Sequence, residues 1–174
     1  DITGVDRVES VTVAPVDENR KPIMEKAEKI SCDTLLLSVG LIPENELSKN
    51  SGLELDRITN GPRVDEYRET EHAGVFACGN VLQVHDLVDY VTEESQIAGL
   101  GAAKYIKGEK VTSECVYTQG INGVRYIVPQ RINRKTDADV KLYFRVGAVY
   151  NNAKIVVECD GKEIIAGRET SLKI

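Results

Sequence analysis

The sequence lacks several features that would assign the chain to a class at once. Its 174 residues include no tryptophan and one methionine, and no apolar stretch approaches the roughly 20 residues of a membrane span. The formal net charge is −6 and the pI is near 5.1. An acidic chain of this kind argues against nucleic acid or an anionic membrane as the main partner. With 41% hydrophobic and 29% charged residues, an ordinary globular protein with a core is expected.

Cysteine and histidine are scarce and scattered. The chain has two histidines, and its four cysteines, at positions 32, 78, 115 and 159, form no CxxC pair. A zinc site is therefore poorly supported, and reduced thiols in a cytoplasmic protein are the simplest interpretation. The sequence predicts neither catalytic residues nor a metal site.

The glycine-rich dinucleotide fingerprint GxGxxG is also missing. The nearest candidate, GLGAA at residues 99–103, lies inside a predicted helix and not in a turn between a strand and a helix. The chain by itself is therefore expected to be inactive in dinucleotide chemistry.

The amino-terminal residues have the pattern of a β-hairpin. Apolar and polar residues alternate over 5–14, which favours a half-exposed strand, and residues 15–21 have the composition of a turn. A second arm is predicted over 23–30, although its Glu and Lys content also permits a helical turn.

Two apolar runs end on a glycine, CDTLLLSVG at 32–40 and GVFACGN at 74–80. A continuous apolar run is typical of a strand in a sheet that helices cover on both faces, and such sheets bind ligands at the carboxyl ends of their strands. Without a Cβ, Gly79 would let the chain turn tightly beside a ligand. We therefore predict strands at 33–40 and 74–79.

A helix is predicted from about Thr92 to Ile106, with Thr92 as its N-cap. One face should carry Ile97, Leu100, Gly101 and Tyr105. The acids before and within its first turn, Asp86, Asp89, Glu93 and Glu94, are interpreted as solvated capping charges and not as a metal cluster. His85 is interpreted as a loop or interface residue, and not as a catalytic base. A shorter helix is predicted within 44–52.

From residue 111 the composition changes to short runs of β-branched and aromatic residues. Turns are predicted at Asn151-Asn152 and Asp160-Gly161, the second being a strong hairpin signal. Residues 115–174 are typical of a small antiparallel β-domain, part of a sandwich. The alternation within 138–168 is interpreted as core patterning.

The ordered motifs DTLLLSVGLIPEN and ETEHAGVFACGN resemble the second half of the FAD domain in the pyridine nucleotide-disulfide oxidoreductases, the flavoproteins that include thioredoxin and glutathione reductases. The matching residues are Asp33, Leu35 to Leu37, Ser38, Gly40 and Pro43, then Thr70, Val75 to Cys78 and Gly79. The alanine- and glycine-rich helix follows in order. In detail the motifs resemble FAD-dependent oxidoreductases that accompany anaerobic-type glycerol-3-phosphate dehydrogenases.

This resemblance implies an α/β fold, the second half of the FAD domain of a two-dinucleotide-binding-domain flavoprotein, Rossmann-like, followed by a small antiparallel all-β, sandwich-like domain. The implied domains are 1–31, a terminal hairpin remnant of an NAD(P)-binding domain, then 32–110, the carboxy-terminal half of the FAD-binding domain, and 111–174, the β-domain. Because the first residue is Asp1 and not methionine, the chain is expected to be a piece of a longer protein.

The resemblance also implies nine cofactor-binding residues: Ser38, Val39, Gly40, Gly79, Asn80, Val81, Val91, Thr92 and Glu93. In the family an acid at the position of Asn80 accepts a hydrogen bond from a ribityl hydroxyl of FAD. The start of the following helix offers backbone amides to the pyrimidine end of the flavin. Asn80 departs from that pattern, yet its amide oxygen can still accept the bond.

The implied activity is hydride transfer between NAD(P)H and flavin in the full-length protein, with FAD as cofactor held together with a missing amino-terminal part, and NAD(P)H as co-substrate. Two alternatives stay open. The chain could be a non-catalytic interaction module that docks a dehydrogenase partner subunit, or a complete α/β protein without flavin. Its uncovered apolar strands predict self-association of the fragment.

Overall fold

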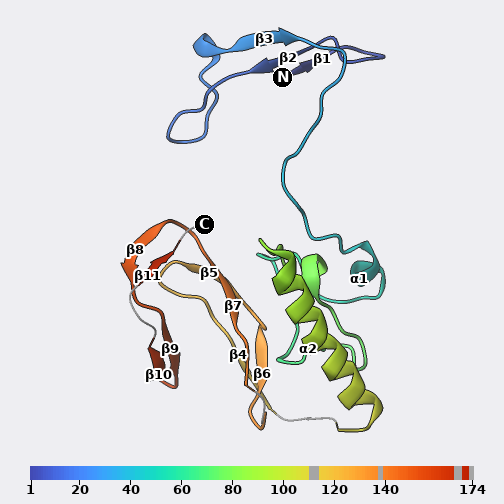
Figure 1. Cartoon of the computed structure of the whole chain (residues 1–174), viewed down its shortest axis with the longest axis vertical. Helices are drawn as coiled ribbons and strands as arrows, with labels where there is room; N and C mark the ends of the chain where they lie inside the picture. The colour runs from blue at the N-terminus through green and yellow to red at the C-terminus, as the bar shows by residue number, and fades with distance from the viewer. Residues whose placement is uncertain (110–113, 137–138, 167–169, 173–174) are drawn as a thin grey trace. The chain divides into compact units, whose positions relative to one another are not determined.

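The computed structural model describes residues 1–109, 114–136, 139–166 and 170–172 (Figure 1). The chain divides into two compact units, Asp1–Gly40 and Leu41–Ile174. This division differs from the three predicted domains, which stay a prediction. In the described part of the chain, no helix has both the length and the apolar character needed to cross a membrane.

The first unit is a small antiparallel sheet of three strands, β1 (Ile2–Thr3), β2 (Ser10–Val13) and β3 (Glu28–Ser31), in that order. The predicted hairpin is confirmed, because β2 pairs with β3. The carboxylate of Asp17 closes its turn by accepting the amides of Asn19 and Lys21, both at 2.8 Å. A 3-10 helix, η1 (Met24–Lys26), precedes β3, so both structures considered for 23–30 occur.

The predicted strand at 33–40 is wrong. These residues form no regular structure, and Leu36 and Val39 are 90% and 83% exposed. A strand needs a hydrogen-bonded neighbour, and none of the described strands pairs with this segment. The described strand pairs are all antiparallel, so the parallel sheet that the apolar runs predicted is not formed by these residues.

The second unit contains the helices α1 (Glu46–Asn50) and α2 (Val88–Ile106) and the 3-10 turn η2 (Gly79–Val81). Both predicted helices are confirmed, but α2 begins four residues before Thr92. Leu87 is its N-cap residue, and Thr92 donates its hydroxyl to the Val88 carbonyl at 3.2 Å. The role of Thr92 as N-cap is therefore wrong.

The predicted strand at 74–79 is also wrong as a sheet strand. It forms a single antiparallel bridge, between Phe76 and Glu69. Around that bridge the Thr70 amide donates to the Val75 carbonyl at 2.8 Å, and the Ala77 amide donates to the Arg68 carbonyl at 3.0 Å. The segment thus pairs locally with the residues just before it, because no neighbouring parallel strand is available among the described residues.

The α2 face that packs on the rest of its unit carries Glu94, Ala98 and Gly101. A Cβ on Gly101 would lie 2.5 Å from the Tyr67 carbonyl oxygen, so the helix approaches that backbone more closely than any larger residue would allow. The predicted face is therefore wrong at Leu100, which is 55% exposed, whereas the Tyr105 ring lies edge-on to Phe76 with the ring centroids 6.4 Å apart.

The carboxy-terminal region consists of small antiparallel sheets. Its strands are β4 (Cys115–Tyr117), β5 (Val124–Val128), β6 (Arg131–Asn133), β7 (Tyr143–Val146), β8 (Tyr150–Ala153), β9 (Val156–Cys159), β10 (Lys162–Ala166) and β11 (Thr170–Leu172). The pairs are β4 with β6, β5 with β7, β8 with β11, and β9 with β10. Among the described residues these are two-stranded ladders and not the predicted sandwich.

One of the two predicted turns in this region is confirmed. Asp160 and Gly161 connect β9 to β10, with φ of 50° and 73°. Asn151 and Asn152 were expected to turn the chain, but both lie inside β8, so that prediction is wrong.

The hydrophobic core of the second unit joins the middle of the chain to this region. Val64, Ala77, Leu82 and Val128 are buried together, and Tyr126 and Tyr143 pack against them. Val128 and Tyr126 of β5 and Tyr143 of β7 therefore pack against apolar residues of the segment 64–82.

Candidate functional site

The turn η2 lies against the beginning of α2. Gly79 is buried and has a φ of +72°, a left-handed conformation that favours glycine. A Cβ at this position would lie 3.2 Å from Cγ1 of Val91. A side chain would therefore strain the backbone and also push the turn away from the helix.

Asn80 is half-buried in this turn. Its Oδ1 accepts a hydrogen bond from the backbone amide of His85 at 3.1 Å. This bond fixes the direction of the side-chain amide. A carbonyl oxygen has two lone pairs, so Oδ1 can accept one more donor.

The centre of the site is the buried carboxylate of Glu94, in the second turn of α2. Its Oε1 accepts Nε of Arg68 at 3.1 Å, and its Oε2 accepts the Gly79 amide at 2.8 Å. Nε2 of His85 lies 2.8 Å from the same Oε2. The side chains of Arg68 and Glu94 are 0% exposed and that of His85 is 4% exposed. Each oxygen of this carboxylate is therefore engaged away from water.

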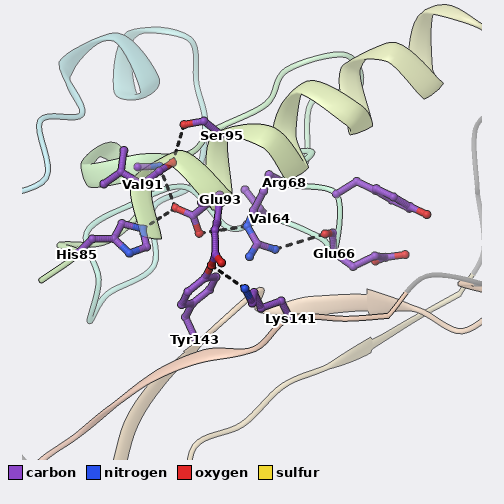
Figure 2. A network of polar contacts seen from close by, with 12 residues as sticks. Val64, Glu66, Arg68, His85, Val91, Glu93, Ser95, Lys141 and Tyr143 are labelled. Atoms are coloured by element: carbon purple, nitrogen blue, oxygen red, sulfur yellow. Dashed lines mark hydrogen bonds and ion pairs between the residues drawn. The ribbon is translucent and has the colours of Figure 1, made fainter. Parts of the chain in front are cut away.

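Arg68 is held on several sides within this network (Figure 2). Its backbone is in the left-handed region at φ 67°, and its Nη1 donates to the Glu66 carbonyl at 3.4 Å. Its guanidinium lies 5.7 Å from the ring centroid of Tyr143. Nη2 is buried without a hydrogen-bond partner. Burying Nη2 in this way costs free energy, and the attraction between the guanidinium and the Tyr143 ring offsets part of that cost.

Glu93, the neighbour of Glu94, meets Tyr143 of β7 and Lys141 just before that strand (Figure 2). Its Oε2 accepts Nζ of Lys141 at 2.6 Å and the hydroxyl of Tyr143 at 3.1 Å. The hydrogen bond from Lys141, followed by that from Tyr143, lowers the pKa of Glu93. Burial, followed by the hydrogen bond to Glu93, raises the pKa of Tyr143 to about 12. At neutral pH the phenol is thus a donor to an ionised Glu93.

Further polar contacts connect the carboxy-terminal strands to the residues before α2, within the second unit. Arg145 donates to both carboxylate oxygens of Asp86 at 3.1 Å and to the Val84 carbonyl at 3.2 Å. The buried Asn133 donates its backbone amide and its Nδ2 to the Glu66 carboxylate at 3.0 Å. Strands β6 and β7 therefore brace the segments that carry the site.

The structure brings together six of the nine predicted cofactor-binding residues, namely Gly79, Asn80 and Val81 with Val91, Thr92 and Glu93. Ser38, Val39 and Gly40 lie in the first unit, in the segment without regular structure. Since α2 begins at Val88 and the Tyr90 amide donates to the Leu87 carbonyl at 3.2 Å, the open amides at its start belong to residues 88 and 89, while helical geometry pairs those of residues 92 and 93. The predicted helix start was displaced by one turn.

The sequence interpretation missed the buried network. Glu94 was expected to be a solvated capping charge and is fully buried, so that prediction is wrong. A signal for it was present: Glu94 has the i, i+4, i+7 spacing to Ala98 and Gly101 of the buried stripe. His85 was expected in a loop, which is confirmed, but its ring is buried against Glu94 and lies edge-on to Tyr143 at 5.5 Å. Nothing in the pattern around Arg68 signalled its burial.

The residues present suit one edge of an organic ligand better than a metal. The described residues contain no group of three or more His, Cys, Asp or Glu side chains able to hold a metal ion, and none of the four cysteines, all of which are described, forms a disulfide. The turn, by contrast, has a glycine that permits close backbone approach and an asparagine oxygen with a spare lone pair. This arrangement fits the ribityl-facing role that the sequence motif implies.

Comparisons with known proteins relate the sequence to one protein family. The profile described as pyridine nucleotide-disulphide oxidoreductase matches residues 3–97, more than half of the chain. A protein of Shigella flexneri named nitric oxide reductase FlRd-NAD(+) reductase is 27% identical over 107 residues. Its namesakes from two Escherichia coli strains, O127:H6 and O157:H7, are 27% and 26% identical over the same length.

These alignments cover 62% of this chain but only 26% of each relative. The chain therefore spans about a quarter of the length of the curated proteins it matches. No solved structure gives a significant match.

Proposed function

Because the chain belongs to the pyridine nucleotide-disulphide oxidoreductase family, whose members bind FAD and NAD(P)H, we propose that it supplies the ribityl- and isoalloxazine-facing half of an FAD site. The observation that carries this proposal is the family match, which spans both the Gly79–Asn80 turn and the first half of α2. In the protein that contains this chain, the site serves hydride transfer between NAD(P)H and flavin. The chain alone, without a GxGxxG fingerprint, is inactive.

The residues assigned to the cofactor have distinct roles. Gly79 gives the backbone room to approach the cofactor, and Asn80 accepts a ribityl hydroxyl with the lone pair that His85 leaves unused. Val81 and residues 91–93 lie on the adjoining surface, and the open amides at the start of α2 provide a positive end for the electron-rich flavin ring. Ser38, Val39 and Gly40 are assigned on the sequence motif alone.

Two resemblances bear on the electron partner. The curated relatives are named nitric oxide reductase FlRd-NAD(+) reductase. The detailed motifs instead resemble the oxidoreductases that accompany anaerobic glycerol-3-phosphate dehydrogenases. We propose the second as the working assignment, with a dehydrogenase subunit as the partner. Both readings share an NAD(P)H-reducible flavin.

The test is the visible spectrum of the purified protein that contains this chain. A yellow protein that NADH or NADPH bleaches without oxygen supports the proposal. A colourless protein that cannot be reconstituted with FAD contradicts it and favours the interaction module.

The role of Asn80 is tested separately with matched variants. Asn80→Asp should retain FAD, because a carboxylate also accepts from the ribityl hydroxyl. Asn80→Leu should lose it, because an unpaired hydroxyl costs roughly 1–3 kcal/mol. Asn19→Leu, at an exposed turn of the first unit, serves as the control and should change nothing. Full flavin content in Asn80→Leu would show that the role is misassigned.

A further inference from the structure

The carboxylate of Glu94 contacts both ends of the segment from Gly79 to His85. Oε2 of Glu94 accepts the Gly79 amide and lies at hydrogen-bond distance from the His85 ring, each at 2.8 Å. The backbone amide of His85 in turn donates to Oδ1 of Asn80. The shape of this segment, and the direction in which Asn80 points, are therefore tied to a single group on α2.

We propose that Glu94 and His85 are positioning residues of the flavin site, which hold the η2 turn in the geometry that presents Asn80 to the cofactor. This inference rests on the function proposed above. Neither residue touches the cofactor in the proposal. Both act through Gly79 and Asn80.

The energetics of the pair support a role beyond filling space. Burying two charges costs desolvation that their attraction offsets only when the geometry is good, and apolar residues of similar volume often stabilise a fold equally well. Here the carboxylate accepts three donors, two of which come from the segment that carries the proposed ligand contacts. A leucine at position 94 could fill the volume but could not hold the Gly79 amide.

The surroundings keep the His85 ring in place. Tyr143 of β7 lies edge-on to it at 5.5 Å, and the guanidinium of Arg68 lies over the Tyr143 ring. Arg145 holds Asp86, the next residue along the chain. The ring therefore has little room to leave Glu94, and the position of the 79–85 segment is fixed from both α2 and the carboxy-terminal strands.

The experiment uses variants at His85 in the protein that contains this chain, with the dissociation constant for FAD measured by flavin fluorescence. His85→Leu removes the donor to Glu94 and should weaken FAD binding about tenfold, the loss expected for one buried hydrogen bond to a charged group. His85→Gln, whose amide nitrogen can still donate to Glu94, should restore affinity to within about threefold. His72→Leu is the matched control at an exposed histidine and should bind FAD normally.

A second variant separates positioning from general loss of stability. Val146→Ala truncates a buried residue of β7 that lies outside the core cluster containing Leu82 of the 79–85 segment. It should lower the melting temperature at least as much as His85→Leu and still bind FAD tightly. Equal loss of affinity in Val146→Ala and His85→Leu, or unchanged affinity in His85→Leu, would overturn the inference.

The Gly79 amide gives a readout that needs no flavin. Its hydrogen exchange should quicken in His85→Leu and stay slow in His72→Leu and His85→Gln, because only the first loosens the carboxylate. Equal exchange in all three would also overturn the inference. If the wild-type protein binds no FAD, the proposed function fails. If the wild-type protein binds FAD and the His85 variants bind it with the same affinity, only the positioning role fails.

Discussion

Two parts of the chain invert the usual relation between polarity and burial. In the segment 34–44, which has no regular structure, most apolar side chains are exposed, with Leu36 at 90% and Ile42 at 83%. Around η2 and α2, the ionic side chains of Arg68 and Glu94 are 0% exposed. The comparison teaches that burial follows the partners available to a residue. Glu94 has donors on both oxygens, whereas none of the described strands lies beside Leu36.

The largest effect should come from breaking the buried ion pair. Glu94→Leu leaves the Arg68 charge buried without a counter-charge and should reduce the free energy of unfolding by about 3–5 kcal/mol, measured by urea denaturation. The neighbouring Glu93→Gln, which removes a half-exposed carboxylate, should cost far less.

Removing both charges sharpens the same test. Arg68→Met combined with Glu94→Leu should recover part of the loss, because no unpaired charge remains, although the Gly79 amide still lacks its acceptor. If Glu94→Leu costs no more than Glu93→Gln, the burial of this carboxylate has no energetic consequence and the comparison fails.

A smaller effect is expected at the contact between β6 and Glu66. Asn133→Ala removes a side-chain donor to a carboxylate that is 5% exposed, and should reduce the free energy of unfolding by about 1–3 kcal/mol. Arg134→Ala is the matched control one residue further on, in an exposed pair with Glu114 at 3.8 Å, and should stay within about 0.5 kcal/mol of the wild type. Equal losses of unfolding free energy at both positions would mean that the hydrogen bonds from Asn133 to Glu66 do not stabilise the fold.

The phenol of Tyr143 gives a pH-dependent and smaller effect. Its pKa of about 12 in the folded chain is above the ordinary value of 10. Its contribution is therefore fully present below pH 10 and is lost as the pH rises from 10 towards 12. The unfolding free energy of the wild type should fall more steeply over this window than that of Tyr143→Phe.

Tyr117→Phe is the control for this profile, because Tyr117 is 77% exposed. Its profile should superimpose on that of the wild type. Identical profiles for Tyr143→Phe and the wild type would contradict the assignment of the raised pKa.

The smallest effect on stability is expected in the exposed apolar segment. Replacing Leu36, Leu37 and Val39 together with serine should change the free energy of unfolding by less than about 0.5 kcal/mol, because these side chains bury little surface. The same change should reduce self-association of the chain in light scattering, since exposed apolar patches favour contact between copies. A loss above about 2 kcal/mol would show that the segment is packed in solution.

Local patterns predicted the local structure well. The hairpin between β2 and β3, the helices α1 and α2, and the Asp160–Gly161 turn each follow from residues close in sequence. Asn152 shows the limit of such rules, because it adopts a positive φ of 54° inside β8 and makes no turn. Backbone conformations of this kind are shared by turns and irregular strands.

The elements that depend on distant partners were not predicted. The apolar run at 33–40 would become a strand only beside another strand, and the described residues offer none. The motif selected Gly79 and Asn80, and their role toward a cofactor stays a prediction. The buried carboxylate of Glu94 was missed, since charge near a helix start is usually solvated. Burial of Glu94 requires Arg68, which lies 26 residues away in sequence.

The segment between β3 and α1 has a consequence for proteolysis. Proteases bind their substrates as exposed, extended chain, and residues 34–44 form no regular structure and are mostly exposed. The stretch contains leucine, isoleucine and valine but no lysine or arginine. Thermolysin, which cleaves before large apolar residues, should therefore release the amino-terminal sheet by cutting here, whereas trypsin has no site within the same residues.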